Sequence, residues 1–164
     1  MTPLPSLLQE VSSTLKRLHW QLVTAESCTG GLIASSITDL AGSSAWFERG
    51  FITYSNLAKQ EMLDVPEELI IKHGAVSKEV ARAMVTGALQ HSVGQIALAV
   101  TGIAGPDGGS IEKPVGTVCF AWSIRNLSPR MLKKRFHGTR QEIRLAAAQE
   151  ALQGVLSIIK KGNT

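Results

Sequence analysis

The sequence contains few of the residues that mark a disulfide scaffold, a zinc site or a single-strand nucleic-acid surface. It has two cysteines, Cys28 and Cys119, and neither forms a C-x-x-C pair or a zinc-like Cys/His spacing. Aromatic residues make up only 5% of the chain, so platforms for stacking bases are scarce. These shortages argue against a disulfide-rich protein, a zinc protein and a single-strand binder.

Long apolar runs and a recognisable export signal are also missing. The opening MTPLPSLLQEV lacks a basic segment followed by an apolar core, and no apolar run is long enough to span a bilayer. We therefore expect no membrane partner. Together with the absence of paired cysteines, this predicts a soluble protein in a reducing compartment, most simply the cytoplasm.

The charge balance is only mildly basic. There are 17 Lys and Arg residues against 13 Asp and Glu residues, which gives a net charge of +4. Part of the excess lies in one segment, namely Arg130, Lys133, Lys134 and Arg135, with Arg140 just beyond. A solvated strand face explains this group better than a nucleic-acid track. We therefore expect no nucleic-acid partner. A nucleic-acid binder would rest on these few charges alone, and its affinity for DNA or RNA would depend steeply on salt.

The sequence does contain amphipathic helices that alternate with apolar strands. Helices are predicted over 6–19 (with Leu7, Leu8, Val11, Leu15 and Leu18 on one face), 29–40, 56–63, from Pro66, from the N-cap Ser77, and over 139–160. Strands are predicted over 20–26, 46–54, 95–102, 115–124 and 130–137, the last two as a hairpin, and KGNT as a frayed tail. This order predicts a single domain over 1–164, a three-layer α/β/α sandwich around a mostly parallel or mixed sheet.

The stretch TAESCTGG, residues 24–31, follows the first predicted strand. Open α/β sheets bind their ligands at the carboxyl ends of strands. Gly30 and Gly31 permit close approach of the backbone, and the following helix start offers N–H groups for a phosphate or an oxyanion. A turn with Ser or Thr as an ordinary helix cap is an equally good interpretation of this spacing alone.

Ser27 needs a base to become a nucleophile. No G-x-S-x-G motif is present, and each of the four histidines (His19, His73, His91 and His137) sits where a structural role is expected. Lys59, just beyond the second strand, is the remaining base if burial lowers its pKa. Taken alone, a lysine on a short helix is more often solvated. Cys28 is the rival nucleophile, although a small buried side chain is its plainer interpretation.

Two further segments attract attention. The segment TGIAGPDGG, residues 101–109, follows an apolar strand but matches neither the Walker loop nor G-x-G-x-x-G. Its glycines permit close contact with a ligand, whereas Asp107 is most simply a turn former. Arg140 and Arg144 are four residues apart and share a helix face, where they are able to hold a phosphate unless they are merely exposed.

Five strings in this order resemble the CinA C-terminal domain family: TAESCTGG, TDLAGSSAWFERGFITYSNLAK, HGAVS, TGIAGPDGG with KPVGTV, and GTRQEIR. The resemblance covers nearly the whole chain. It implies hydrolysis of the carboxamide of nicotinamide mononucleotide to nicotinate mononucleotide and ammonia, in pyridine nucleotide salvage. It also implies an α/β/α fold, no metal, no cofactor, and a homodimer or higher homo-oligomer. Ser27 is then the nucleophile and Lys59 its base.

The resemblance and the motifs together give a set of expected substrate-binding residues: Cys28, Thr29, Gly30, Gly31, Tyr54, Asn56, Thr101, Gly102, Gly105, Arg140 and Arg144. Packing and turn formation explain Tyr54 and Asn56 equally well. Ile103 departs from the family pattern, in which many members have Thr, so a hydroxyl contact is lost unless Thr101 or Thr29 replaces it. The competing hypothesis is a non-catalytic nucleotide-binding or regulatory domain, because the family includes inactive paralogues.

Overall fold

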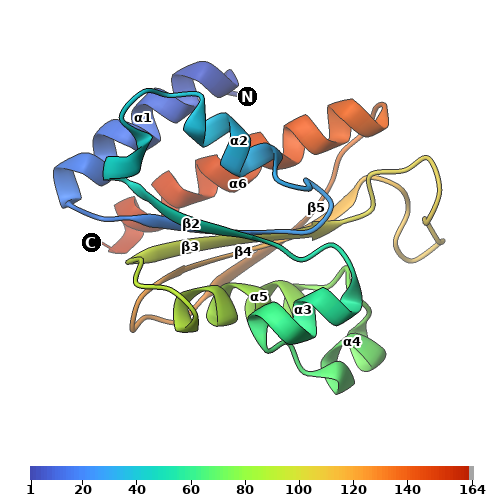
Figure 1. Cartoon of the computed structure of the whole chain (residues 1–164). Helices are drawn as coiled ribbons and strands as arrows, with labels where there is room; N and C mark the ends of the chain where they lie inside the picture. Colours follow the sequence, from blue (N-terminus) through green and yellow to red (C-terminus); the bar gives the residue numbers. More distant parts are fainter. Residues whose placement is uncertain (163–164) are drawn as a thin grey trace.

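The chain folds into three layers, with a mixed sheet between two layers of helices (Figure 1). The computed structural model describes residues 1–162. The strand order is β2-β1-β3-β4-β5. The strands are β1 (Leu22–Glu26), β2 (Phe47–Ile52), β3 (Ile96–Gly102), β4 (Thr117–Ile124) and β5 (Arg130–Arg135). β1 runs parallel to β2 and β3, while β4 runs antiparallel to β3 and β5.

The helices divide between the two faces of the sheet (Figure 1). One layer consists of α1 (Leu4–Leu18), α2 (Leu32–Thr38) and α6 (Arg140–Gly162). The other consists of α3 (Asn56–Leu63), α4 (Glu67–His73) and α5 (Lys78–Gln90). A short 3₁₀ helix, Ser43–Ala45, leads into β2. The predicted three-layer α/β/α fold around a mixed sheet is therefore confirmed.

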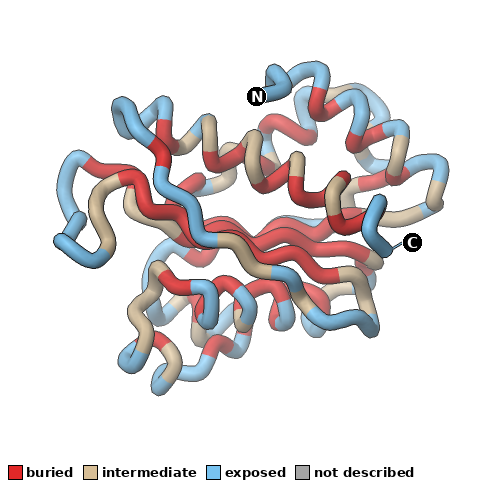
Figure 2. The backbone as a smooth tube through the Cα atoms, turned by 180° about the vertical axis from the view of Figure 1, so that it is seen from behind, coloured by how far each residue is buried: buried red, intermediate tan, exposed pale blue. Residues whose placement is uncertain are grey.

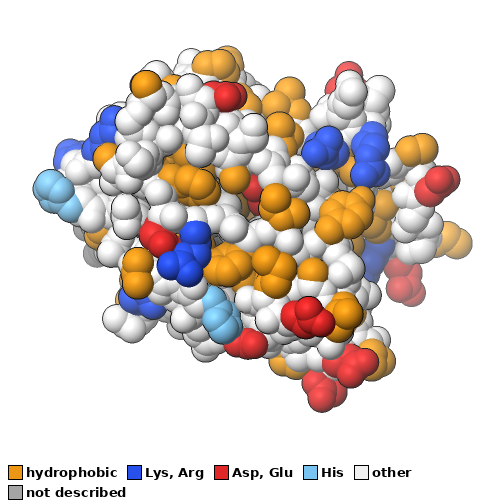
Figure 3. All heavy atoms as spheres, viewed as in Figure 1, with side chains coloured by type: hydrophobic (Ala, Val, Ile, Leu, Met, Phe, Trp, Pro, Cys, Tyr) orange, Lys and Arg blue, Asp and Glu red, His pale blue; other side chains and the backbone are white. Residues whose placement is uncertain are grey.

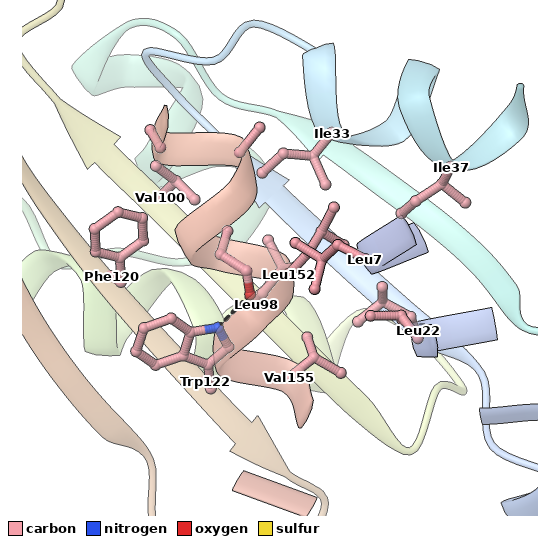
Figure 4. Packing of buried hydrophobic residues seen from close by; sticks show 14 of the residues in the cluster. Leu7, Leu22, Ile33, Ile37, Leu98, Val100, Phe120, Trp122, Leu152 and Val155 are labelled. Carbon is pink, nitrogen blue, oxygen red and sulfur yellow. Dashed lines mark hydrogen bonds between the residues drawn. The ribbon is translucent and has the colours of Figure 1, made fainter. Parts of the chain in front are cut away.

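Burial of the central strands explains why their sequences are apolar without interruption. Every residue of β1 is buried, and so are the first six of β3 and the first seven of β4 (Figure 2). Sheets covered on both faces require such strands. One core lies under α1, α2 and α6, where Trp122 packs against α6 and its indole N–H donates to Ala151 O over 2.7 Å (Figure 4). A second core lies under α5.

Most element boundaries lie one to three residues from the predicted ones. The helix expected from Thr29 begins only at Leu32, because Gly30 and Gly31 have φ values of +57° and +101°. This left-handed conformation suits glycine but is not helical, so these two residues belong to the turn before the helix. The strand expected over 46–54 ends at Ile52. α6 continues through Gly162, two residues into the predicted tail, and the last two residues, 163–164, lie outside the described residues.

The basic segment forms β5, an edge strand of the sheet. Its four basic side chains are all exposed. Lys134 pairs with Glu150 on α6 over 2.8 Å. Exposed charge on an edge strand discourages pairing with other sheets, which is consistent with the predicted solvated face. Within residues 1–162, no helix is both long and apolar enough to cross a membrane.

A close contact between α3 and α5 fixes the helix that carries Lys59. Gly87 lies in the last turn of α5, and a Cβ added there would stand 1.9 Å from the carbonyl oxygen of Leu63, the last residue of α3. Only glycine permits the backbone of α5 to approach the end of α3 this closely. The position of α3 over the sheet therefore depends on Gly87.

We expect Gly87→Ala to lower the free energy of unfolding by about 1–3 kcal/mol, because the added methyl group overpacks this contact. Gly162→Ala is the matched control. Gly162 is also helical, but its added Cβ would meet only Ile124 Cδ1 at 3.6 Å. The control should be neutral or slightly stabilising, since alanine is the better helix former. Urea denaturation of both variants measures the difference, and equal stabilities would contradict the role of Gly87.

Candidate active site

The loops after β1, β2 and β3 meet at one end of the sheet, on the right in Figure 1, because these strands are parallel. They enclose a cleft of about 260 Å³, near the lower limit for small-molecule sites. Ser27 follows β1, Lys59 lies on α3 beyond β2, and residues 101–108 follow β3. Arg140, at the start of α6, completes the rim. The position agrees with the rule for ligand sites in open α/β sheets.

Ser27 and Lys59 form the centre of the cleft. Lys59 Nζ lies 3.0 Å from Ser27 Oγ, although the residues are 32 positions apart in the sequence. The carbonyl oxygens of Thr53 and Tyr54 lie 3.1 and 3.2 Å from the same Nζ. A neutral amine has two N–H donors and one lone pair. In this neutral form, the two N–H groups donate to the carbonyl oxygens of Thr53 and Tyr54. The Ser27 hydroxyl, whose Oγ also lies 3.4 Å from Tyr54 O, is then able to donate to the lone pair.

Burial shifts the Lys59 ammonium towards its neutral form. The side chain is 1% exposed, and it forms no ion pair within residues 1–162. Desolvation disfavours the charged amine and lowers the pKa of Lys59 from its usual value of 10.5. A lysine with a lowered pKa next to a hydroxyl is the arrangement that a serine nucleophile requires when histidine is absent.

Cys28 also lines the cleft, but its thiol is poorly suited to attack. Burial raises the pKa of Cys28 to about 12, in spite of the opposing charge of Arg144. The nucleophilic form of cysteine is the thiolate. At neutral pH this side chain is therefore a protonated, buried group, as its plainer interpretation from the sequence suggested.

Glu26, the last residue of β1, organises the turn that carries Ser27. The carboxylate is fully buried and accepts hydrogen bonds from Thr29 Oγ1 at 2.7 Å, and from the N–H groups of Ile33 at 2.9 Å and Ala34 at 3.1 Å. The first free donors of α2 are thus already paired. A phosphate or an oxyanion is therefore left with the N–H groups of the preceding turn, not with those of Ile33 and Ala34. The hydrogen bonds of Glu26 also explain how a charge without a counter-ion is tolerated inside the fold.

Three N–H groups of the turn have no partner in another described residue. They belong to Cys28, Thr29 and Gly31. Gly30 N–H, in contrast, donates to Ser27 O over 3.0 Å. The backbone immediately after a nucleophile commonly supplies oxyanion donors, and these groups occupy that place in the chain.

The two arginines of α6 have different surroundings. Arg140 lines the cleft, where its guanidinium donates to Gly105 O at 2.7 Å and to the hydroxyl of Tyr54 at 3.3 Å. Arg144 points its guanidinium into the turn after β1 instead. It donates to Cys28 O at 3.2 Å and to Thr29 O at 2.9 Å, and it does not line the cleft.

The loop after β3 forms another wall of the cleft, with Thr101, Gly102 and Gly105 among its lining residues. A Cβ added at Gly102 would stand 3.1 Å from Cys28 Sγ, so glycine lets this wall approach the turn after β1. Thr101 Oγ1 donates to Ala75 O over 2.9 Å but keeps lone pairs that can accept. Ile103 is also among the residues that line the cleft.

The structure brings most of the expected site residues together and leaves four outside. The expected residues that line the cleft are Ser27, Cys28, Tyr54, Asn56, Lys59, Thr101, Gly102, Gly105 and Arg140. The expected residues that do not are Thr29, Gly30, Gly31 and Arg144. The Thr29 hydroxyl is fully buried on Glu26, so it cannot replace the hydroxyl missing at Ile103.

Several lining residues were not predicted, among them Ala75, Val76, Ala104, Asp107 and Gly108. Ala75 and Val76 lie in HGAVS, one of the strings that carry the family resemblance, so a signal was present. Asp107, expected only to form a turn, is exposed at the cleft. Glu26 was visible as a carboxylate before the serine, but nothing in the sequence indicated what it would bind.

The histidines lie outside the cleft, at the ends of elements. His19 ends α1, His73 ends α4, His91 follows α5 and pairs with Asp64, and His137 follows β5. Their positions agree with the structural roles expected of them. Within residues 1–162, no group of three or more His, Cys, Asp or Glu is arranged to hold a metal ion.

Comparisons with known proteins identify the family and the fold. The family model described as "CinA C-terminal domain" matches residues 5–159. A protein of Enterobacter agglomerans named "Nicotinamide-nucleotide amidohydrolase PncC" is 50% identical over 153 residues, which are 93% of either chain. A "CinA-like protein" of Syntrophobacter fumaroxidans is 53% identical over 87% of this chain but only 33% of its own length. The crystal structure of "competence/damage inducible protein CihA" from Agrobacterium tumefaciens superimposes with a TM-score of 0.92 at 45% identity, covering 96% of this chain and 97% of that one.

We expect Glu26→Gln to lower the free energy of unfolding by about 1–3 kcal/mol, because an amide NH₂ would face a backbone N–H donor in a buried site. Glu67→Gln is the matched control, since Glu67 is an exposed carboxylate in the first turn of α4. Urea denaturation at pH 7 compares the two variants. If both lose the same stability, the hydrogen bonds of Glu26 do not hold the turn.

Proposed function

The chain belongs to the CinA C-terminal domain family, and on that premise we propose that it is an amidase that hydrolyses the carboxamide of nicotinamide mononucleotide. The products are nicotinate mononucleotide and ammonia. The 50% identity to a protein named for this activity supports the substrate. The observation that carries the proposal is the buried Lys59 amine, 3.0 Å from Ser27 Oγ and without a carboxylate partner.

In the first half of the reaction, the lone pair of Lys59 Nζ accepts the proton of Ser27 while Oγ attacks the carboxamide carbon. The carbonyl oxygen becomes an oxyanion, which the N–H groups of Cys28 and Thr29 stabilise. One such donor contributes about 3 kcal/mol in other amide and ester hydrolases. The tetrahedral intermediate then breaks its C–N bond. The Lys59 ammonium protonates the leaving nitrogen, so ammonia departs and an ester to Ser27 remains.

In the second half, a water molecule attacks this ester. Lys59, neutral again, accepts a proton from the water, and the second oxyanion occupies the same donors. When the C–O bond to Ser27 breaks, the lysine returns the proton to Oγ. The product forms as a carboxylic acid, which loses its proton to the solvent and becomes a carboxylate, and both side chains regain their initial states. This use of one group as base and then acid is the usual logic of general acid–base catalysis.

The remaining lining residues bind the rest of the nucleotide. Arg140 is the cation at the rim of the cleft, and it keeps N–H donors beyond the two that hold Gly105 and Tyr54. A guanidinium there suits the phosphate. Tyr54 and Asn56 flank the base and face the pyridine ring, while Gly102 and Gly105 allow close contact with the backbone.

The cellular setting stays a prediction. We place the reaction in pyridine nucleotide salvage in the cytoplasm, and we expect a homodimer or higher homo-oligomer. Three large apolar side chains at the end of β2 and just beyond it, those of Ile52, Tyr54 and Leu57, are half or more exposed. Hydrophobic atoms gather on this face of the molecule (Figure 3). Exposed patches of this kind commonly mark protein interfaces, which supports an oligomer.

The competing hypothesis is a domain that binds the nucleotide without turnover. The longer "CinA-like protein" supports this hypothesis, because the match to this chain covers only 33% of that relative, which therefore contains other segments as well. Calorimetry with nicotinamide mononucleotide, combined with an ammonia assay on the same sample, separates the two: an amidase releases ammonia, whereas a regulatory domain only binds.

Removal of either dyad side chain should abolish ammonia release. We expect Ser27→Ala and Lys59→Met to lower kcat by at least about 10³-fold, because each removes a group that handles the transferred proton or bond. Lys72→Met, which alters an exposed lysine on α4, is the control and should retain full activity. Near-full activity of either dyad variant contradicts the mechanism. Activity lost only in Cys28→Ala would transfer the role to the thiol.

The pH dependence should report the lowered pKa of Lys59. Only the neutral amine acts as a base, so kcat/KM should rise with pH and level off with a midpoint below 10.5. The same shift acts on stability: the unfolded chain binds the lysine proton more tightly, so the free energy of unfolding should rise with pH between the folded pKa and 10.5. Lys59→Met should remove this slope. A midpoint at 10.5 or above would show that the amine is solvated.

A further inference from the structure

The side chain of Arg144 contacts the main chain of the turn that follows β1, residues 27–31. The guanidinium reaches from the second turn of α6 to two successive carbonyl oxygens, those of Cys28 and Thr29. A Cβ added at Gly30 would stand 3.6 Å from Arg144 Nη2, so the turn also wraps closely around this side chain. These two contacts direct Arg144 into the protein and away from any ligand in the cleft.

The peptide groups of this turn differ in the hydrogen bonds that fix their orientation. The carbonyl of Ser27 accepts from Gly30 N–H over 3.0 Å, which fixes the Ser27–Cys28 peptide. The carbonyl of Thr29 accepts from Leu32 N–H over 3.0 Å as well as from Arg144. The carbonyl of Cys28 accepts only from Arg144 Nε among the described residues. The orientation of the Cys28–Thr29 peptide thus depends on Arg144 alone.

Peptide planarity converts this contact into a direction for the next N–H group. In a trans peptide the N–H points opposite to the C=O. Because Cys28 O points towards α6, Thr29 N–H points away from α6. The helix α3, with Lys59, covers the face of the sheet opposite to α6 (Figure 1). Within residues 1–162, Thr29 N–H has no partner in another residue, so it is free to donate in that direction.

We propose that Arg144 is a positioning residue that holds the Cys28–Thr29 peptide with its N–H facing the oxyanion of the reaction. The role rests on the proposed amidase function. Without the guanidinium, this peptide is free to rotate, which turns a carbonyl oxygen towards the reacting centre and the N–H donor away from it. Arg144 therefore acts on the transition state through the backbone, while Arg140, four residues earlier, meets the phosphate.

The test separates this role from phosphate binding and from simple folding. Arg144→Lys keeps a positive charge but replaces the two separate donors Nε and Nη2 by a single ammonium nitrogen, and Arg144→Ala leaves space for free guanidinium. Each variant is assayed for ammonia release with nicotinamide mononucleotide and with nicotinamide riboside, which lacks the phosphate. Arg140→Met is the variant of the expected phosphate contact. Arg82→Met alters an exposed arginine on α5 and serves as the control.

We expect both Arg144 variants to lose about 10²- to 10³-fold in kcat on both substrates, with KM changed less than about twofold, as when an oxyanion donor is lost. Added guanidinium should restore part of the kcat of Arg144→Ala. Arg140→Met should raise KM for the nucleotide only, and Arg82→Met should change neither constant. If Arg144→Ala does not fold, Arg144→Lys carries the same comparison.

Two outcomes would overturn the role of Arg144. A raised KM for the nucleotide with unchanged kcat would make Arg144 a phosphate ligand. A loss of activity that follows the folded fraction measured by thermal unfolding, without rescue by guanidinium, would make it a purely structural residue. No ammonia release from the unaltered chain would overturn the proposed function itself, and this role with it.

Discussion

The burial of one lysine without a counter-ion governs the chemistry of this site. Among residues 1–162, the hydrogen-bond partners of Lys59 Nζ are two carbonyl oxygens and the Ser27 hydroxyl, and desolvation lowers the pKa of the amine. A carboxylate in this position would favour the ammonium and remove the base. The fold provides the isolation: α3 places the amine beneath the cleft, and the close packing of Gly87 against Leu63 holds α3 in place.

The charged residues nearest to the nucleophile serve the backbone, not the ligand. Glu26 accepts two N–H groups of α2 and the Thr29 hydroxyl, and Arg144 donates to the carbonyls of Cys28 and Thr29. Glu26 and Arg144 thereby hold the turn between them, and among the described residues the N–H groups of Cys28 and Thr29 have no acceptor. Charge–dipole hydrogen bonds of this kind are strong in a buried site, which gives the turn a defined geometry before a substrate arrives.

Local sequence patterns predicted the elements and their order well, because helical periodicity and uninterrupted apolar strands reflect which faces are buried. They failed at the start of α2, where the composition of 29–40 suits a helix but Gly30 and Gly31 continue the turn. They also treated Arg140 and Arg144 alike, since residues four apart share a helix face. Small differences in direction along that face send one side chain to the cleft and the other to the turn.

By itself, the sequence determined the layered α/β/α fold, the strand that precedes Ser27, and the family to which the chain belongs, because these follow from patterns that neighbouring residues carry. Only the tertiary structure decided that Lys59 meets Ser27, that Glu26 occupies the start of α2, and that Arg144 binds the turn. Such contacts join residues from different elements, and their geometry depends on how the strands align and how closely the helices pack. A linear pattern specifies the elements, whereas the distances between their side chains arise only when those elements pack together.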